Sequence, residues 1–163
     1  MLSQRKHPRL DQALYQYPSH PCSLTIAVKD RQEVFGPRHD EFTKEAINLL
    51  AQYVKTYGVP LHVALFMPDH VHICAEASLQ KSLIHFIGEW KNLTTRLSWQ
   101  YGHHGVLWQK SFFDHFLRKE EHISTVVRYI LNNPLRAKRV THWWEYTYWY
   151  SNQYTIEQLK NFE

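Results

Sequence analysis

The chain has 163 residues, of which 44% are hydrophobic and 21% charged, and its formal net charge is +4 with histidine counted as neutral. This length is enough for one domain with a sizeable core. No apolar run approaches the roughly 18 residues that a membrane span needs, and the N-terminus lacks the apolar core of a signal peptide. The two cysteines do not indicate a disulfide framework, so we expect a cytoplasmic protein.

The basic charge is accompanied by many aromatic residues, including six Trp and ten Tyr. This combination suits nucleic acid, and single strands especially, because cations follow the phosphates and rings stack on bases. An aromatic core beneath an ordinary basic surface would give the same composition. Composition alone therefore leaves both interpretations open.

The first half of the chain predicts a strand, a long helix and a hairpin. Residues 1–20, with several Pro, His and Arg, are expected to form an irregular basic arm. A short β-rich segment at 23–29 precedes a helix at 40–57, whose apolar residues recur at helical spacing. Strands at 61–67 and 70–76 are separated by only two residues, which predicts a hairpin.

The second half predicts a helix, a strand and another helix before an aromatic tail. The helix spans 78–100, with Ser78 as its N-cap and Leu79 on its apolar face. A strand follows at 112–118 and a helix at 120–133. This order, β-α-β-β-α-β-α, predicts an α+β fold of the ferredoxin-like, split βαβ kind, with an antiparallel sheet and its helices on one face. The first and third strands should be central.

His70 and His72 are two residues apart on the expected third strand, so their side chains project from the same face. Val71 turns the other way, towards a core. Adjacent neutral imidazoles are good ligands for borderline metals such as Mn, Zn or Ni. With 12 His in the chain, about one His-x-His pair arises by chance, so a packed or solvated pair is the competing interpretation.

Tyr129 and Asn133 are four residues apart, so on a helix they share a face. Pro134 disfavours helical conformation at the residue before it, and the helix should end near Asn133. An amide at a helix end can turn towards a site. The competing interpretation makes Asn133 a simple helix stop and Tyr129 one of ten tyrosines that fill a core.

Four segments in the same order resemble the single-tyrosine HUH transposases, and within them the REP-associated tyrosine transposases. Residues 67–72, Met-Pro-Asp-His-Val-His, are similar to the family's Met-Pro-Asn-His-Val-His, with Asp for Asn. The other three segments are 105–114 (Gly-Val-Leu-Trp-Gln, then Phe-Phe-Asp), 129–137 (Tyr-Ile-Leu-Asn-Asn-Pro-Leu-Arg-Ala) and 149–151 (Trp-Tyr-Ser).

The resemblance spans roughly residues 20–152. With no linker evident, we expect one HUH transposase domain at 21–152, between the basic arm at 1–20 and a C-terminal tail at 153–163.

The resemblance implies that His70 and His72 are metal ligands, with Asn133 as the third and Asn132 as its competitor. Tyr129 would be the nucleophile that attacks the scissile phosphate, forms a 5′-phosphotyrosine and frees a 3′-OH. The 3′-OH of another strand can then reverse the step without ATP. Mg²⁺ or Mn²⁺ is the expected cofactor. Imidazole nitrogen is a softer ligand than oxygen, which favours Mn²⁺, whereas the greater abundance of Mg²⁺ in cells favours Mg²⁺.

The family's substrates imply single-stranded DNA with hairpins as the partner, and no membrane. The resemblance leaves open whether the protein is a monomer or a homodimer. Basic residues in the arm, on the second helix, beside the fourth strand and after the last helix are candidate DNA contacts: Arg5, Lys6, Arg9, Lys91, Arg96, Lys110, Arg118, Lys119, Arg136, Lys138 and Arg139. The competing interpretations are a disordered arm and a solvated helix end.

Two other functions compete with the transposase. One is a non-catalytic nucleic-acid-binding module of the same fold, and the other is a metal-dependent nuclease that uses water in place of Tyr129. All four reactive positions carry residues capable of the chemistry, and this argues against the non-catalytic binding module. His103, His104 and His115 are expected at the surface or against DNA and not as ligands.

Overall fold

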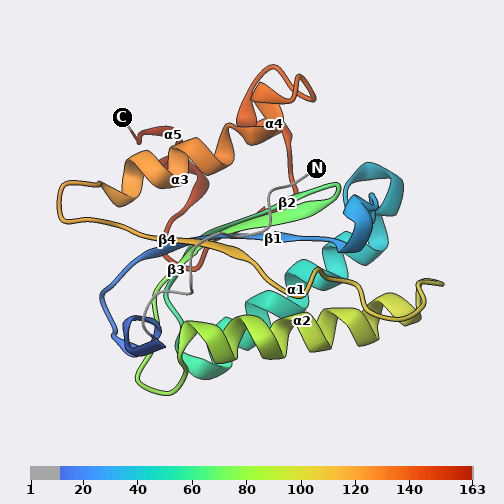
Figure 1. Cartoon of the computed structure of the whole chain (residues 1–163). Helices are drawn as coiled ribbons and strands as arrows, with labels where there is room; N and C mark the ends of the chain where they lie inside the picture. Colours follow the sequence, from blue (N-terminus) through green and yellow to red (C-terminus); the bar gives the residue numbers. More distant parts are fainter. Residues whose placement is uncertain (1–11, 163) are drawn as a thin grey trace.

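A five-stranded sheet runs through the middle of the protein in the order β4-β1-β3-β2-β5 (Figure 1). The computed structural model describes residues 12–162, so the expected arm contacts Arg5, Lys6 and Arg9 lie outside the described residues. Neighbouring strands in the sheet are antiparallel. The strands are β1 (Cys22–Ala27), β2 (Leu61–Met67), β3 (His70–Ala75), β4 (Phe113–Phe116) and β5 (Trp149–Tyr150).

The helices cover both faces of this sheet. In Figure 1, α1 and α2 lie on one side, whereas α3 and α4 lie on the other. The α-helices are α1 (Asp40–Tyr57), α2 (Leu83–Trp99), α3 (Ile123–Leu131), α4 (Asn133–Arg136) and α5 (Ile156–Lys160). Short 3-10 helices add turns at η1 (Gln12–Gln16), η2 (Lys29–Arg31), η3 (Pro37–His39) and η4 (Trp143–Glu145).

The expected α+β class with an antiparallel sheet is confirmed, and β1 and β3 are interior strands. The expectation that all helices share one face is wrong for α3. This helix buries Val127, Ile130 and Leu131, which recur at helical spacing on one side. Every residue of β2 is buried, so the second face of the sheet also needs an apolar cover, and α3 supplies it.

Aromatic rings fill the layer between the sheet and the α1–α2 pair. Phe66 of β2 meets Trp90 of α2 edge to face, with ring centroids 5.9 Å apart. Trp90 lies 5.2 Å from Trp108, and Phe35 contacts both Phe66 and Trp108. Such pairs add to the free energy gained by burying their area. A large part of the aromatic excess in the sequence therefore belongs to the core.

The predicted hairpin is confirmed, and it sets the position of the histidines. Met67 at the end of β2 pairs with His70 at the start of β3, which leaves a two-residue turn. On its other side β3 pairs with β1, where Ala27 lies opposite His70 and Thr25 lies opposite His72. The two histidines therefore occupy the middle strand of the sheet.

The helices expected at 78–100 and 120–133 have different limits in the structure. The second helix begins at Leu83, and its N-cap is Ser82, whose side chain accepts a hydrogen bond from the His85 backbone amide. Ser78 instead donates to the Tyr57 carbonyl oxygen, and Leu79 is 95% exposed. The segment after Ser78 is thus a turn tied to the end of α1.

The last long helix is shorter than the expected 120–133, because α3 ends at Leu131 and α4 begins anew at Asn133. Asn132 joins them at φ −80° and ψ 0°. No helix within residues 12–162 is long and apolar enough to cross a membrane.

Replacing Ile130 by Ala should lower the free energy of unfolding by about 3 kcal/mol, because it leaves a cavity where α3 packs on the sheet. Urea unfolding followed by circular dichroism measures this. Arg128→Ala on the exposed side of the same helix is the control and should change stability by less than about 0.5 kcal/mol. Equal losses for both would contradict the packing of α3.

Candidate active site

His70 and His72 project from the sheet face that α3 covers. Val71 pairs with Phe66, which packs against α2, and side chains alternate along a strand. The imidazole rings are nearly perpendicular, at 89°, and their Nε2 atoms are 3.1 Å apart. The structure therefore brings this pair together as the sequence predicts, with the two Nε2 atoms within hydrogen-bonding distance of each other.

Each imidazole is held through its other nitrogen. Nδ1 of His70 donates to Oδ1 of Asp69 at 2.6 Å, and Nδ1 of His72 is hydrogen-bonded to Oγ1 of Thr25 at 3.1 Å. Oδ2 of Asp69 in turn pairs with Nε of Arg31 at 2.8 Å. A carboxylate on the far nitrogen of a ligating histidine fixes both its tautomer and the direction of the ring.

Burial lowers the pKa of both histidines. It brings the pKa of His72 to about 3, with smaller contributions from His70 and from the charges of Arg136 and Arg31. Burial also lowers the pKa of His70, although the Asp69 carboxylate works against this. At neutral pH both rings are therefore neutral, which is the form that binds a metal.

Asp69, Thr25 and Arg31 were not expected at this site from the sequence. The sequence holds one usable signal for Asp69, because this residue directly precedes His70. Partial burial raises the pKa of Asp69, but the hydrogen bond from His70 and the charge of Arg31 outweigh it, so the pKa is lowered and the carboxylate stays ionised. Thr25 could be found only once the register of β1 and β3 was known.

Tyr129 and Asn133 lie at the end of α3 and the start of α4. The Tyr129 side chain is 61% exposed, so it does not fill the core. Nδ2 of Asn133 donates to the Ile130 carbonyl oxygen at 2.9 Å and thereby caps the end of α3. Asn132 is the C-cap of α3, and Asn133 is the first residue of α4, so the expected helix stop lies one residue before Asn133.

The donor set suits a divalent cation. Within residues 12–162 no group of three or more His, Cys, Asp or Glu side chains is placed to hold a metal. Two metal–nitrogen bonds of about 2.1 Å at a right angle span about 3.0 Å. The separation of the two Nε2 atoms, 3.1 Å, fits this arrangement. The imidazole pair is a donor set that suits borderline divalent metals.

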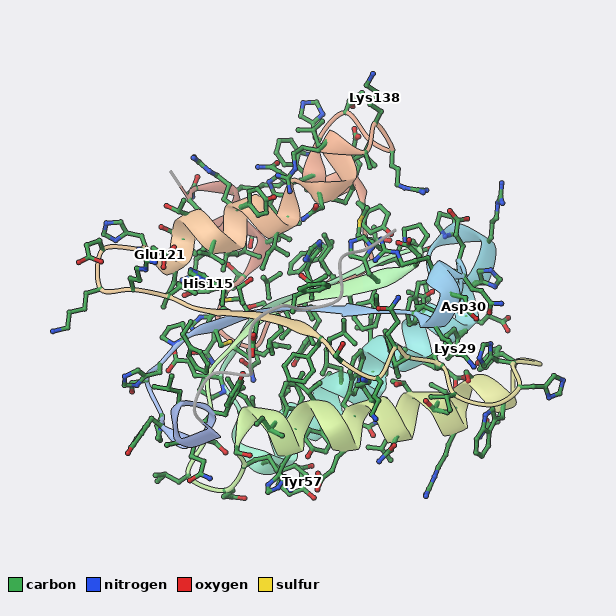
Figure 2. All side chains as sticks on the ribbon, viewed as in Figure 1. Lys29, Asp30, Tyr57, His115, Glu121 and Lys138 are labelled. Carbon is green, nitrogen blue, oxygen red and sulfur yellow. The ribbon has the colours of Figure 1, made fainter. Side chains whose placement is uncertain are left out.

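The expected DNA contacts are spread over several surfaces. Figure 2 shows Lys138 at the outer end of α4 and the His115–Glu121 pair near the opposite end of α3. Arg136 lies with its guanidinium 4.0 Å from the centre of the Tyr129 ring, and Arg139 pairs with Glu33 at 3.8 Å.

The second helix carries its basic residues across the sheet from α3. Lys91 of α2 donates to the Gln109 carbonyl oxygen at 2.6 Å, and Arg96 lines a hollow between α1 and α2. Arg118 and Lys119 follow β4 and are exposed, as is Lys110 before it. Among these expected DNA contacts, Arg136 at the end of α4 is the one that lies against Tyr129.

The family model described as "Transposase IS200 like" matches residues 17–133, and the chain belongs to this family. The matched range contains both histidines and Tyr129 and ends at Asn133. No protein of curated function matches the chain.

Two solved structures share the fold. One is a REP-associated tyrosine transposase bound to a REP hairpin, with a TM-score of 0.68 and 16% identity over 90% of this chain and 82% of that chain. The other, from Deinococcus radiodurans R1 and described as a candidate transposase, has a TM-score of 0.52 and 22% identity over 81% of this chain and 97% of that chain.

Replacing Asp69 by Ala should weaken Mn²⁺ binding by about 10- to 100-fold, because His70 loses the carboxylate that orients it. Calorimetric titration of the DNA-free protein with MnCl₂ measures this. Asp69→Asn keeps an acceptor oxygen and should lose less.

Asp30→Asn is the matched control, because it removes a carboxylate from the turn after β1 (Figure 2) that forms no hydrogen bond to His70. Its Mn²⁺ affinity should stay at the wild-type value. Wild-type affinity in Asp69→Ala would contradict the orienting role.

Proposed function

We propose that the chain is a metal-dependent endonuclease and strand-transferase for single-stranded DNA that carries hairpins. The observation that carries this proposal is the convergence of His70 and His72 on the sheet face covered by α3, the helix that presents an exposed Tyr129. Membership of a transposase family supports the reaction class. The likeness to a structure with a bound hairpin supports the choice of substrate.

Tyr129 is the nucleophile in this proposal. Its Oη forms a bond to the scissile phosphorus while the bond from phosphorus to the 3′ oxygen breaks. The phenol proton goes to solvent, and the departing 3′ oxygen takes up a proton to become a free 3′-OH. The product is a 5′-phosphotyrosine, in which a phosphodiester with Tyr129 replaces the phosphodiester of the DNA. Attack by the 3′-OH of another strand can therefore rejoin the DNA and release Tyr129.

His70, His72 and the Asn133 amide oxygen would hold Mg²⁺ or Mn²⁺. When bound, the cation polarises the phosphate and neutralises developing charge. Asp69 and Thr25 keep the imidazoles in the ligating tautomer and orientation. We propose that Tyr129 acts in its own chain, because α3 packs on the β2–β3 hairpin that carries the histidines.

Basic side chains after α4 would guide the strand to Tyr129. Arg136, Lys138 and Arg139 lie next to it in the chain, while Arg118, Lys119 and Lys110 could contact a hairpin near β4. Lys91 and Arg96 lie on α2 across the sheet, so we leave them out of the proposed surface.

Tyr129→Phe should abolish a covalent protein–DNA adduct that the wild-type protein forms with a hairpin oligonucleotide in MnCl₂. The phenol oxygen is the only atom removed, so hairpin binding should be retained. Denaturing gel electrophoresis with a label on the 3′ side of the cleavage site detects the adduct, since the 5′-phosphate of that fragment stays on the protein.

Tyr17→Phe is the matched control, because it removes the same oxygen from a tyrosine that is 55% exposed and distant in the sequence. It should form the adduct at the wild-type rate. Cleavage that persists in Tyr129→Phe would instead indicate a nuclease that uses water, and binding without cleavage by the wild-type protein would indicate a binding module.

His70→Ala should abolish cleavage and leave hairpin affinity largely intact, because the imidazole belongs to the reaction centre and the basic surface is unchanged. Cleavage assays and fluorescence anisotropy on one labelled oligonucleotide measure both quantities. A parallel loss of affinity would contradict a purely catalytic role for this side chain.

A further inference from the structure

Arg136 stands out among the basic residues because its guanidinium lies on the Tyr129 ring, 4.0 Å from the ring centre. Cations are attracted to the faces of aromatic rings, and Arg also stacks on them. Arg31 and Arg139 pair with Asp69 and Glu33. Within residues 12–162 no carboxylate forms an ion pair with Arg136, so its charge is not neutralised there.

The break between α3 and α4 is what positions this guanidinium. In an unbroken helix a residue seven positions on lies about 10 Å further along the axis. Here Asn132 closes α3, and α4 starts a new turn in which the Arg136 amide donates to the Asn132 carbonyl oxygen at 2.9 Å. Pro134 is buried in this turn and anchors it. Arg136 thus sits on a short, anchored helix and reaches back to Tyr129.

Arg136 belongs to α4, which follows closely after α3, and α3 packs on the β2–β3 hairpin that carries the histidines. The charge of Arg136 lies directly beside the proposed nucleophile. A phosphate attacked by Tyr129 must enter this same region.

We propose that Arg136 is a catalytic residue that binds the non-bridging oxygens of the scissile phosphate while Tyr129 attacks it. The inference rests on the proposed function. The guanidinium fork matches two phosphate oxygens and offsets the negative charge that builds up as the Oη–P bond forms and the P–O3′ bond breaks. Arg136 stays protonated throughout, so the proton balance of the step is unchanged.

The other basic residues of this region are less suited to the role. Arg139 is engaged with Glu33, and Lys138 points outward from the end of α4 (Figure 2). Lysine also lacks the planar fork that binds two oxygens at once. Arg136 is therefore the one of the three that the geometry assigns to the reacting phosphate.

The test compares the wild-type protein with Arg136→Gln on two oligonucleotides. One has a normal scissile phosphodiester, and the other has a neutral methylphosphonate at that position, with each diastereomer used separately. On the diester, Arg136→Gln should slow adduct formation by about 100-fold or more while hairpin affinity changes little. On the methylphosphonate, which lacks the charge that Arg136 offsets, the two proteins should differ by far less.

Arg128→Gln on the exposed side of α3 is the matched control, because it removes the same charge from a residue next to Tyr129 in sequence. It should keep the wild-type rate on both oligonucleotides. Circular dichroism and urea unfolding of each variant check that it is folded.

The inference is overturned if Arg136→Gln reacts with the diester as fast as the wild type, or if its defect is equally large on the methylphosphonate. The second result would mean that Arg136 only positions the Tyr129 ring. A wild-type protein that forms no adduct with the diester would overturn the proposed function itself, and the inference with it.

If the wild type attacks neither methylphosphonate diastereomer, the role of Arg136 is tested by the binding affinity for the two oligonucleotides. Tyr129→Phe should then bind the diester more tightly than the methylphosphonate, and the double variant with Arg136→Gln should lose that preference. A preference that survives in the double variant overturns the inference.

Discussion

The antiparallel pairing of β1 with β3 is the constraint on which the candidate site depends. It places Thr25 opposite His72 and the small side chain of Ala27 opposite His70. Because strand side chains alternate between faces, a slip of one residue would turn both imidazoles into the aromatic layer and bring Val71 out. The burial of Val71 and Ile73 opposes such a slip, so the apolar core fixes the direction of the histidines.

On α3 as well, the residues that pack in the core determine the direction of a candidate site residue. Ile130 faces the sheet and is 1% exposed, whereas its neighbour Tyr129 points outward. Consecutive residues on a helix differ by about a quarter turn, so the packing of one side determines where the other points. Stability and the proposed chemistry therefore use different sides of one helix, and each can vary without loss of the other.

Local periodicity explains which parts of this fold could be predicted. The limits of α1 and of the β2–β3 hairpin follow from apolar spacing and from Gly58, which ends α1 in the left-handed conformation. The start of α2 could not be predicted, because Ser78 and Ser82 are equally good caps and the choice depends on a bond from Ser78 to Tyr57. No local pattern shows which face of a sheet a helix will cover, and for this reason the prediction that α3 lies on the same face as the other helices is wrong.

The candidate site shows the same limit. The shared face of His70 and His72 could be predicted from their spacing, because it is a property of any strand. The ties of Asp69 to Arg31 and of His72 to Thr25 join residues far apart in the sequence, and they become visible only once β1 lies beside β3. The interruption between α3 and α4 at Asn132 could not be predicted, because two adjacent Asn residues followed by a proline allow the helix to end at several positions.

The distribution of the groups over the chain has a mechanical consequence. Tyr129, Asn133 and Arg136 belong to one short continuous segment, whereas both histidines belong to the sheet. The helical segment and the sheet contact each other through apolar side chains, and no covalent link within the site joins them. A small slide of α3 over β2 and β3 would therefore carry the phenol, the amide and the guanidinium as one rigid body. Their mutual spacing would be conserved, whereas the gap to the imidazoles would change.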